Sequence, residues 1–297
     1  METARNCALC GSATREDVAH PASTYATRGT YRIITCERCG VGQTVPVPDA
    51  AELGAFYAKD YKYDAHVLIA REKRWRARRM LELAAPAGGW HGKRILDVGC
   101  MYGYLLEEGA RKGAREAVGV ELSAGPANDA RARGMDVFHG TIEAFAKERP
   151  ARFDAIFAQH VLEHVADLGA FLDTARSLLA PGGRLCICLP NFETRTRRVF
   201  PEAWGWYQVP VHLWHFSARS LDRLLEGHGF DVARTARRGG DSLLVLLTLL
   251  QSVGRAPAGD ATEPGALSKA ALRAASALLR PYYFVGDDEL IVLATPR

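Results

Sequence analysis

The chain has 297 residues, 48% of them hydrophobic, and a formal net charge of +4. This length suits one α/β core with a small accessory module, and so mild a charge neither demands nor excludes an anionic partner. No apolar run reaches the roughly 20 residues that cross a bilayer, and the start of the chain lacks the apolar core of a signal peptide, so we expect a cytoplasmic protein without a transmembrane segment.

Two cysteine pairs near the amino terminus predict a metal site. Cys7 and Cys10 form one CxxC pair, and Cys36 and Cys39 form the other. Four thiolates on two tight turns suit tetrahedral zinc, and a site with four cysteine ligands has no open coordination position. We therefore expect a structural zinc ribbon over residues 1–45. Free or redox-active thiols are the alternative interpretation.

Residues 46–90 are predicted to form a linker and a helical cap. The prolines at 46 and 48 break regular structure, and an aromatic-rich segment follows. A basic run around Trp75 then predicts a charged helix. Its members are Arg71, Lys73, Arg74, Arg76, Arg78 and Arg79. Such a stripe could follow nucleic-acid phosphates, but a solvated charged face is the commoner outcome, so we regard nucleic acid as an unlikely partner.

The stretch from Ile95 to Leu106 predicts a buried strand, a glycine turn and a helix. Asp97, Gly99 and Gly103 define the turn, where glycine permits positive φ and a close approach of backbone to ligand. The next predicted strand ends in Glu121, whose carboxylate can accept both ribose hydroxyls of a nucleotide-type cofactor. The spacing from Gly99 to Gly103 is not GxGxxG, which disfavours NAD or a flavin.

Five segments in order are similar to the motifs of class I S-adenosylmethionine (SAM)-dependent methyltransferases. They are ILDVGCMYG, VGVEL, GTIEAF, FDAIFAQHVLEHV and LLAPGGRLCICLPN. The resemblance implies an α/β fold with a Rossmann-like doubly wound sheet, mostly parallel with one antiparallel edge-hairpin strand. It places this domain at 91–297, with helical insertions near 240–285. The ribbon and the following aromatic segment resemble a bacterial group that acts on sugars, surface glycans or secondary metabolites.

The resemblance also implies which residues bind the cofactor. They are Asp97, Gly99, Met101, Gly103, Glu121, Leu122, Thr141, Ile142 and Gln159. The first four surround the aminoacyl end of SAM, Glu121 holds the ribose and Leu122 packs on the adenine. Thr141 and Ile142 follow at the adenine edge, and Gln159 lies beside the sulfonium. Met101 stands where the family usually has the middle glycine of DxGxGxG.

Polar side chains follow the predicted strand at 153–158. His160, Glu163 and His164 form an HxxEH string, which is also the inverted zinc-protease signature, but that signature belongs within a helix. Small-RNA 2'-hydroxyl methyltransferases and ubiquinone-pathway O-methyltransferases have a similar ExxEH here and can use a divalent ion, so a catalytic divalent metal stays open, although His160 replaces the first glutamate. A further imidazole is offered by His212. We expect one of these histidines to be the general base. Alternatively, Glu163 and His164 only cap and pack a helix.

The predicted insertion contains an apolar run at 243–250 that needs burial, a partner subunit or an acyl-bearing substrate. Burial or a homodimer is the simpler interpretation. The sequence therefore predicts a SAM-dependent methyltransferase that O-methylates a small-molecule, saccharide or lipid-linked acceptor, such as a glycolipid or another hydroxylated metabolite. The alternatives are a zinc-ribbon RNA methyltransferase and a non-catalytic zinc-ribbon binding protein with an idle SAM fold.

Overall fold

The structure is a computed structural model that describes residues 6–19, 21, 30–49, 53–54, 70–240, 278 and 281–297. The chain divides into two compact units. The first joins 1–54, 189–224 and 236–291, and the second joins 55–188, 225–235 and 292–297. Most of the predicted insertion and of the aromatic segment lies outside the described residues. The predicted domain boundaries stay a prediction.

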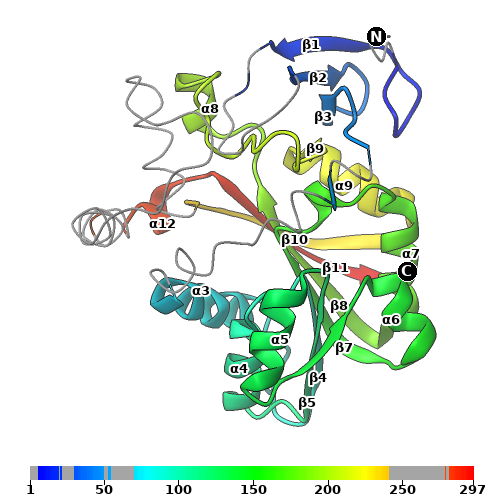
Figure 1. Cartoon of the computed structure of the whole chain (residues 1–297), viewed down its shortest axis with the longest axis vertical. Coiled ribbons are helices and arrows are strands. Elements are labelled where there is room, and N and C mark those ends of the chain that lie inside the picture. The colour runs from blue at the N-terminus through cyan, green and yellow to red at the C-terminus, as the bar shows by residue number, and fades with distance from the viewer. Residues whose placement is uncertain are drawn as a thin grey trace. The chain divides into compact units, whose positions relative to one another are not determined.

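A seven-stranded sheet runs in the order β10-β11-β8-β7-β4-β5-β6 (Figure 1). Its strands in chain order are β4 (Arg94–Val98), β5 (Glu116–Glu121), β6 (Asp136–His139), β7 (Phe153–Gln159), β8 (Leu179–Pro190), β10 (Phe230–Arg238) and β11 (Glu289–Pro296). Asp97 on β4 lies opposite Gly119 on β5 and Phe157 on β7, both in parallel register. The strand order reverses between β4 and β7, which is where open α/β sheets bind ligands, outside the carboxyl ends of the strands.

Helices cover both faces of the parallel strands. They are α3 (Ala70–Leu83), α4 (Tyr104–Arg111), α5 (Ala124–Ala132), α6 (Ile142–Glu148) and α7 (Leu168–Leu178). The first three lie on one face and the last two on the other, as right-handed crossovers require (Figure 1). Because both faces are covered, the middles of the central strands are mainly apolar, and Ile95, Leu96, Ile156 and Phe157 are fully buried.

The far edge of the sheet is antiparallel. The amide of Asn191, just after β8, donates to the carbonyl of Asp288, just before β11, so these strands run in opposite directions. Arg238 at the end of β10 pairs with Glu289 at the start of β11, so these two strands also run antiparallel. The predicted doubly wound, mostly parallel sheet with an antiparallel edge is confirmed.

The first unit contains a second sheet, with the strand order β1-β2-β3-β9. Its strands are β1 (Thr14–Val18), β2 (Arg32–Cys36), β3 (Gly42–Val45) and β9 (Trp214–His215), all paired antiparallel. The ribbon strands thus take their fourth member from a distant part of the chain. An aromatic and aliphatic cluster forms the core here, and its members are Val18, Tyr31, Ile33, Phe192, Trp204, Trp206, Tyr207 and Val209.

Three further α-helices are α8 (Arg195–Val199), α9 (Ala218–Gly227) and α12 (Tyr282–Val285). The hydroxyl of Ser217 accepts the Ser220 amide at 3.2 Å, which provides the amino-terminal cap of α9. Within the described part of the chain, no helix has both the length and the apolar character to cross a membrane.

Candidate active site

The turn after β4 is left-handed at three positions. Gly99, Met101 and Gly103 have φ angles of 70°, 50° and 71°. Glycine adopts this conformation freely, whereas a residue with a Cβ loses about 1–2 kcal/mol there. Met101 therefore keeps the backbone shape that a glycine would give, with local strain. A Cβ on Gly99 would lie 2.6 Å from Val161 Cγ2, so this position needs glycine.

Glu121 ties the glycine turn to the end of β5. It is buried, and its Oε2 accepts the Met101 amide at 2.8 Å while its Oε1 accepts the Ser123 amide at 2.7 Å. Each carboxylate oxygen has a second lone-pair direction, so this carboxylate can still accept from a ligand hydroxyl. These two hydrogen bonds hold the Glu121 carboxylate, which the sequence predicts to bind the cofactor, rigidly beside the turn.

Asp97 is buried near the end of β4. Its burial, and then the negative charge of Glu121, raise the pKa of Asp97 well above its usual range. A positive ligand would favour the ionised form and offset this cost. The two carboxyl groups therefore suit a cofactor that carries positive charge.

The residues predicted on the adenine side follow β5 and β6. Because Glu121 lies opposite His139 in parallel register, the chain after each strand emerges at the same edge. Leu122 is 51% exposed, a large fraction for leucine at a strand end, and the carbonyl of Leu122 lies 3.1 Å from His139 Nε2. Thr141 caps α6 by accepting the Ala144 amide at 3.2 Å.

Ile142, which is also predicted at the adenine edge, is buried in the protein core. Ile142 is the first residue of α6 and is only 2% exposed. Gln159 ends β7 and pairs in parallel register with Cys188 on β8, so it lies at the same edge of the sheet as the glycine turn.

His160 follows β7 directly and has a left-handed backbone, with φ of 54°. Its amide donates to the Cys188 carbonyl at 2.7 Å, which holds the bend. Its Nδ1 lies 3.3 Å from Glu163 Oε1. A carboxylate only accepts, so Nδ1 carries the proton in this contact and Nε2 is the nitrogen that holds the lone pair of the neutral ring.

Glu163 is almost completely buried, and its Oε2 has no hydrogen-bond partner among the described residues. Buried acceptors are normally satisfied, so this oxygen suits a donor that arrives with a ligand. Glu163 and the half-buried His164 lie in a single 3-10 turn, Leu162–His164. The HxxEH string is thus not on the continuous helix that the protease signature needs.

His212 belongs to the first unit and is 2% exposed. Its Nδ1 lies 2.8 Å from the carbonyl of Trp206, which accepts, so Nδ1 again carries the ring proton. His212 therefore shows the same tautomer as His160, each within its own unit. Whether these two imidazoles serve one acceptor is a proposal.

The four paired cysteines come together in the first unit. The Sγ atoms of Cys7 and Cys39 are 3.7 Å apart, those of Cys10 and Cys36 are 3.5 Å apart, and all four lie within 4.8 Å of one another. All are free thiols. Tetrahedral zinc with Zn–S bonds of about 2.3 Å places sulfur atoms about 3.8 Å apart, so the cluster fits such an ion.

The basic helix α3 is engaged by acidic partners. Arg74 pairs with Glu107 at 3.1 Å, and Arg78 donates to both oxygens of Glu108 at 3.2 Å. Both glutamates lie on α4 within the same unit. These pairs neutralise part of the basic stripe, so the helix packs on its neighbour and does not present all its charge to a polyanion.

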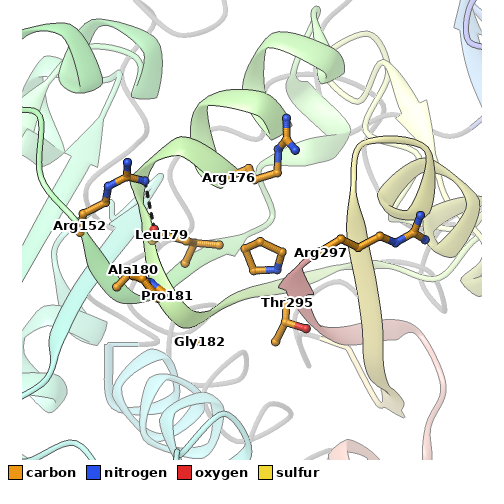
Figure 2. Close-up of a pocket in the computed structure, with 9 residues that line it drawn as sticks. Arg152, Arg176, Leu179, Ala180, Pro181, Gly182, Thr295 and Arg297 are labelled. Carbon is orange, nitrogen blue, oxygen red and sulfur yellow. Dashed lines mark hydrogen bonds between the residues drawn. The ribbon is translucent and has the colours of Figure 1, made fainter.

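A cavity of about 380 Å³ opens at the end of the sheet opposite the glycine turn (Figure 2). Leu179 lies in its wall and pairs with Phe153 at the start of β7, so the cavity is at the amino ends of these strands. Its three arginines already have partners. Arg152 donates to the Ser177 and Leu179 carbonyls, Arg176 pairs with Asp173 at 3.8 Å, and Arg297 pairs with Asp231 at 2.7 Å. The cavity is therefore not the cofactor site.

Comparisons with known proteins agree with this geometry. Residues 69–235 match the family described as "Methyltransferase domain". A ubiquinone biosynthesis O-methyltransferase of Klebsiella pneumoniae is 34% identical over 109 residues, which cover 35% of this chain and 45% of that protein. The corresponding enzyme of Xylella fastidiosa is 41% identical over 106 residues, which cover 34% and 43%. The matches thus span less than half the length of these relatives.

A crystal structure of a SAM-dependent methyltransferase from Archaeoglobus fulgidus has the same fold. It superposes with a TM-score of 0.53 over 79% of this chain and 99% of its own, at 19% sequence identity. At this identity the likeness concerns the fold alone.

Proposed function

The chain belongs to the methyltransferase domain family and is a SAM-dependent methyltransferase, and from that premise we propose that it methylates a hydroxyl oxygen. The acceptor we propose is a saccharide, a glycolipid or another hydroxylated metabolite. The observation that carries the proposal is the His160–Glu163 contact at the end of β7, 3.3 Å long, which supplies an oriented imidazole. The relatives named above are O-methyltransferases by name, which supports oxygen as the accepting atom.

The residues around the glycine turn fit SAM. We propose that Asp97, Gly99, Met101 and Gly103 hold its aminoacyl end and that Glu121 accepts the ribose hydroxyls. We assign Leu122, Thr141 and Ile142 to the adenine; Leu122 and Thr141 are exposed, whereas Ile142 is buried. We place Gln159 near the sulfonium. When bound, SAM supplies a methyl group that its sulfonium already activates.

The protein's own contribution to the reaction is orientation and proton removal. Glu163 fixes the His160 ring by accepting from Nδ1, which directs the Nε2 lone pair to the acceptor hydroxyl. His160 would take the hydroxyl proton as the acceptor oxygen attacks. Bound SAM would supply the methyl group and leave as a neutral thioether when its sulfur–methyl bond breaks. The unpartnered Oε2 of Glu163 can receive a second hydroxyl of the acceptor. We assign His164 and His212 to the same acceptor as positioning or alternative basic groups.

The experiment is a search for the product with purified protein. We would titrate SAM by calorimetry and then offer labelled SAM with nucleotide sugars, glycolipids, phenols and total RNA, the RNA at low and high salt. A methyl ether on a sugar, glycolipid or phenol, located by mass spectrometry and NMR, is the expected result. Methylation of nitrogen, carbon or RNA would overturn the proposed acceptor class, and absent SAM binding would support an idle SAM fold.

We further propose that the cysteine cluster holds a structural zinc ion. The spacing of the four sulfur atoms, all within 4.8 Å of one another, supports this, because it suits one tetrahedral ion. One zinc per chain is expected by elemental analysis. Cys39→Ser should lose the metal and lower thermal stability, whereas Cys186→Ser, at a buried cysteine in β8, should keep the metal. An unchanged zinc content in Cys39→Ser would exclude this site.

A catalytic divalent ion stays an alternative for Glu163 and His164. Because a structural zinc would complicate chelation, the informative comparison is activity with and without added Mg²⁺ or Mn²⁺ in protein of constant zinc content. A strict requirement for the added ion would favour the metal mechanism over the His160 base.

A further inference from the structure

The cysteine ribbon is built into the segment that carries His212. Strand β3 follows the second cysteine pair directly, and β3 pairs with β9, with Gly42 opposite His215 and Gln43 opposite Trp214. A Cβ on Gly42 would lie 2.9 Å from His215 Cβ and 2.9 Å from Phe192 Cε1. The two strands therefore meet too closely for any residue but glycine at position 42.

Thr44 on β3 makes three hydrogen bonds to this segment. Its amide donates to the Leu213 carbonyl at 3.0 Å, and its hydroxyl donates to the His212 carbonyl at 2.6 Å. The same hydroxyl lies 3.0 Å from His215 Nε2. A hydroxyl has one proton, and a carbonyl can only accept, so Thr44 must accept from His215 Nε2–H. This fixes the His215 tautomer with its proton on Nε2.

His215 is neutral in this setting. Its burial, and then the nearby positive charge of Arg197, lower the pKa of His215 to about 3. Its ring packs against Phe192 and Tyr207, with centroids 5.3 and 5.9 Å away. A neutral, enclosed ring with one defined tautomer is a rigid support for its neighbours.

Two of the hydrogen bonds of His212 fix it within the first unit. Thr44 holds its carbonyl, and the Trp206 carbonyl holds its Nδ1 at 2.8 Å. The first contact depends on β3, and β3 depends on the turn at Cys36–Gly40, where the Gly40 amide donates to the Cys36 carbonyl at 3.0 Å and the Cys36 amide donates to the Val41 carbonyl at 3.0 Å. A metal on the cysteines would fix this same turn.

We propose that Thr44 is a positioning residue through which the metal-bound ribbon sets the orientation of His212 for methyl transfer. This inference rests on the proposed function, because it gives the ribbon a part in acceptor chemistry through His212. Without the Thr44 hydroxyl, the carbonyl of His212 and the Nε2–H of His215 lose their buried partner. The imidazole of His212 should then occupy several orientations.

The test uses the full-length, zinc-loaded protein with ¹⁵N-labelled histidine. In the wild type we expect NMR shifts of His215 that report a proton on Nε2, and those of His212 that report a proton on Nδ1. In Thr44→Val, both sets of shifts should change, and in Thr44→Ser they should return. Glu16→Gln removes a charge pair of the same sheet, with Arg32 at 3.4 Å, and should leave both histidines unchanged.

Methyl transfer gives the second readout. Thr44→Val should lower kcat about tenfold with an unchanged Kd for SAM, and Thr44→Ser should restore kcat. Removal of zinc from the wild type should shift the His212 and His215 signals, and added Zn²⁺ should return them. Shifts that place the His215 proton on Nδ1 in the wild type would overturn the inference, even if Thr44→Val failed to fold.

His212→Ala separates this inference from the proposed function. If His212→Ala loses activity and Thr44→Val keeps wild-type kcat and histidine shifts, the coupling through Thr44 is wrong while the role of His212 stands. If His212→Ala keeps full activity, His212 has no role in the reaction, and the inference falls with that part of the proposed function.

Discussion

The amide of Met101 donates a 2.8 Å hydrogen bond to the carboxylate of Glu121, which joins the glycine turn after β4 to the end of β5. The same carboxylate accepts from Ser123 through its other oxygen. One residue thus both shapes the turn and presents acceptors at the cofactor edge. Loss of the Glu121 carboxylate should therefore weaken cofactor binding in two ways, by loosening the turn and by removing acceptors for the ligand.

Glu121→Gln should weaken SAM binding. The amide side chain has only one acceptor atom, so it cannot satisfy the Met101 and Ser123 amides and also receive ribose hydroxyls. Hydrogen bonds to a charged group contribute about 1.5–3 kcal/mol each, which predicts a Kd for SAM raised about 10- to 100-fold by calorimetry. Glu116→Gln, at the start of the same strand and paired with Arg94 at 2.6 Å, should bind SAM normally. Equal affinities for the two variants would refute the assignment.

Substitutions at Met101 test whether the backbone is left-handed at this position. A residue with a Cβ is strained at φ of 50°, so Met101→Gly should be more stable than Met101→Ala by about 1 kcal/mol in urea unfolding. The two variants both lack the methionine side chain, so their difference isolates the backbone. A matched alanine and glycine pair at Asn128, an exposed position within helix α5, should show the reverse order, because glycine destabilises a helix interior. An alanine variant as stable as the glycine variant at 101 would contradict a left-handed backbone there.

Asp97→Asn should separate stability from binding. The folded pKa of Asp97 lies above its unfolded value, so the native state holds a proton that the unfolded state releases. The unfolding free energy contributed by this group therefore falls as pH rises from the usual aspartate range toward the folded pKa. Asparagine does not ionise, so Asp97→Asn avoids this fall in unfolding free energy. Without cofactor, the variant should be more stable than the wild type at neutral pH, and the stability difference should shrink on acidification to about pH 4. Its affinity for SAM should fall, because the negative charge is gone.

Asp154 on β7 is a control, because its pKa is shifted in the direction opposite to that of Asp97. Its burial would raise the pKa, but the Arg94 amide and the Lys93 ammonium together outweigh burial and lower it. Its ionised form is stabilising above the usual aspartate pKa, and that contribution is lost on acidification through the folded pKa. Asp154→Asn should therefore be less stable than the wild type at neutral pH. If both asparagine variants moved Tm in the same direction at neutral pH, the opposite pKa shifts would be wrong.

The sequence predicted the parallel sheet well, because its strands are short apolar runs with glycine turns between them. Ile95 to Gly103 carries local signals for a strand and a turn, and Val118 to Glu121 carries those for a strand with an acid at its end. The family resemblance then supplied the cofactor, which the matches to methyltransferases support. The acceptor has no comparable local signal, since the segment predicted to shape it is mostly outside the described residues.

Relationships between distant segments were not readable from the sequence. Thr44 contacts His212 and His215 across most of the chain, and nothing in the local pattern of β3 indicates that partner. Likewise, the six basic residues before the core predicted a charged face, but the pairing of Arg74 with Glu107 and of Arg78 with Glu108 depends on how α3 packs on α4. Tertiary packing decides both.

The most direct test of His160 as the general base is the single-turnover rate of methyl transfer in His160→Ala at saturating SAM. We predict a rate about 10²- to 10⁴-fold below wild type, an unchanged Kd for SAM, and loss of the fall in rate that protonation of a histidine base causes at acidic pH. His228→Ala, at a partly exposed histidine near Asp173, is the control and should match the wild type. A His160→Ala rate equal to the wild-type rate, with the same pH dependence, would contradict the role of His160 as the base.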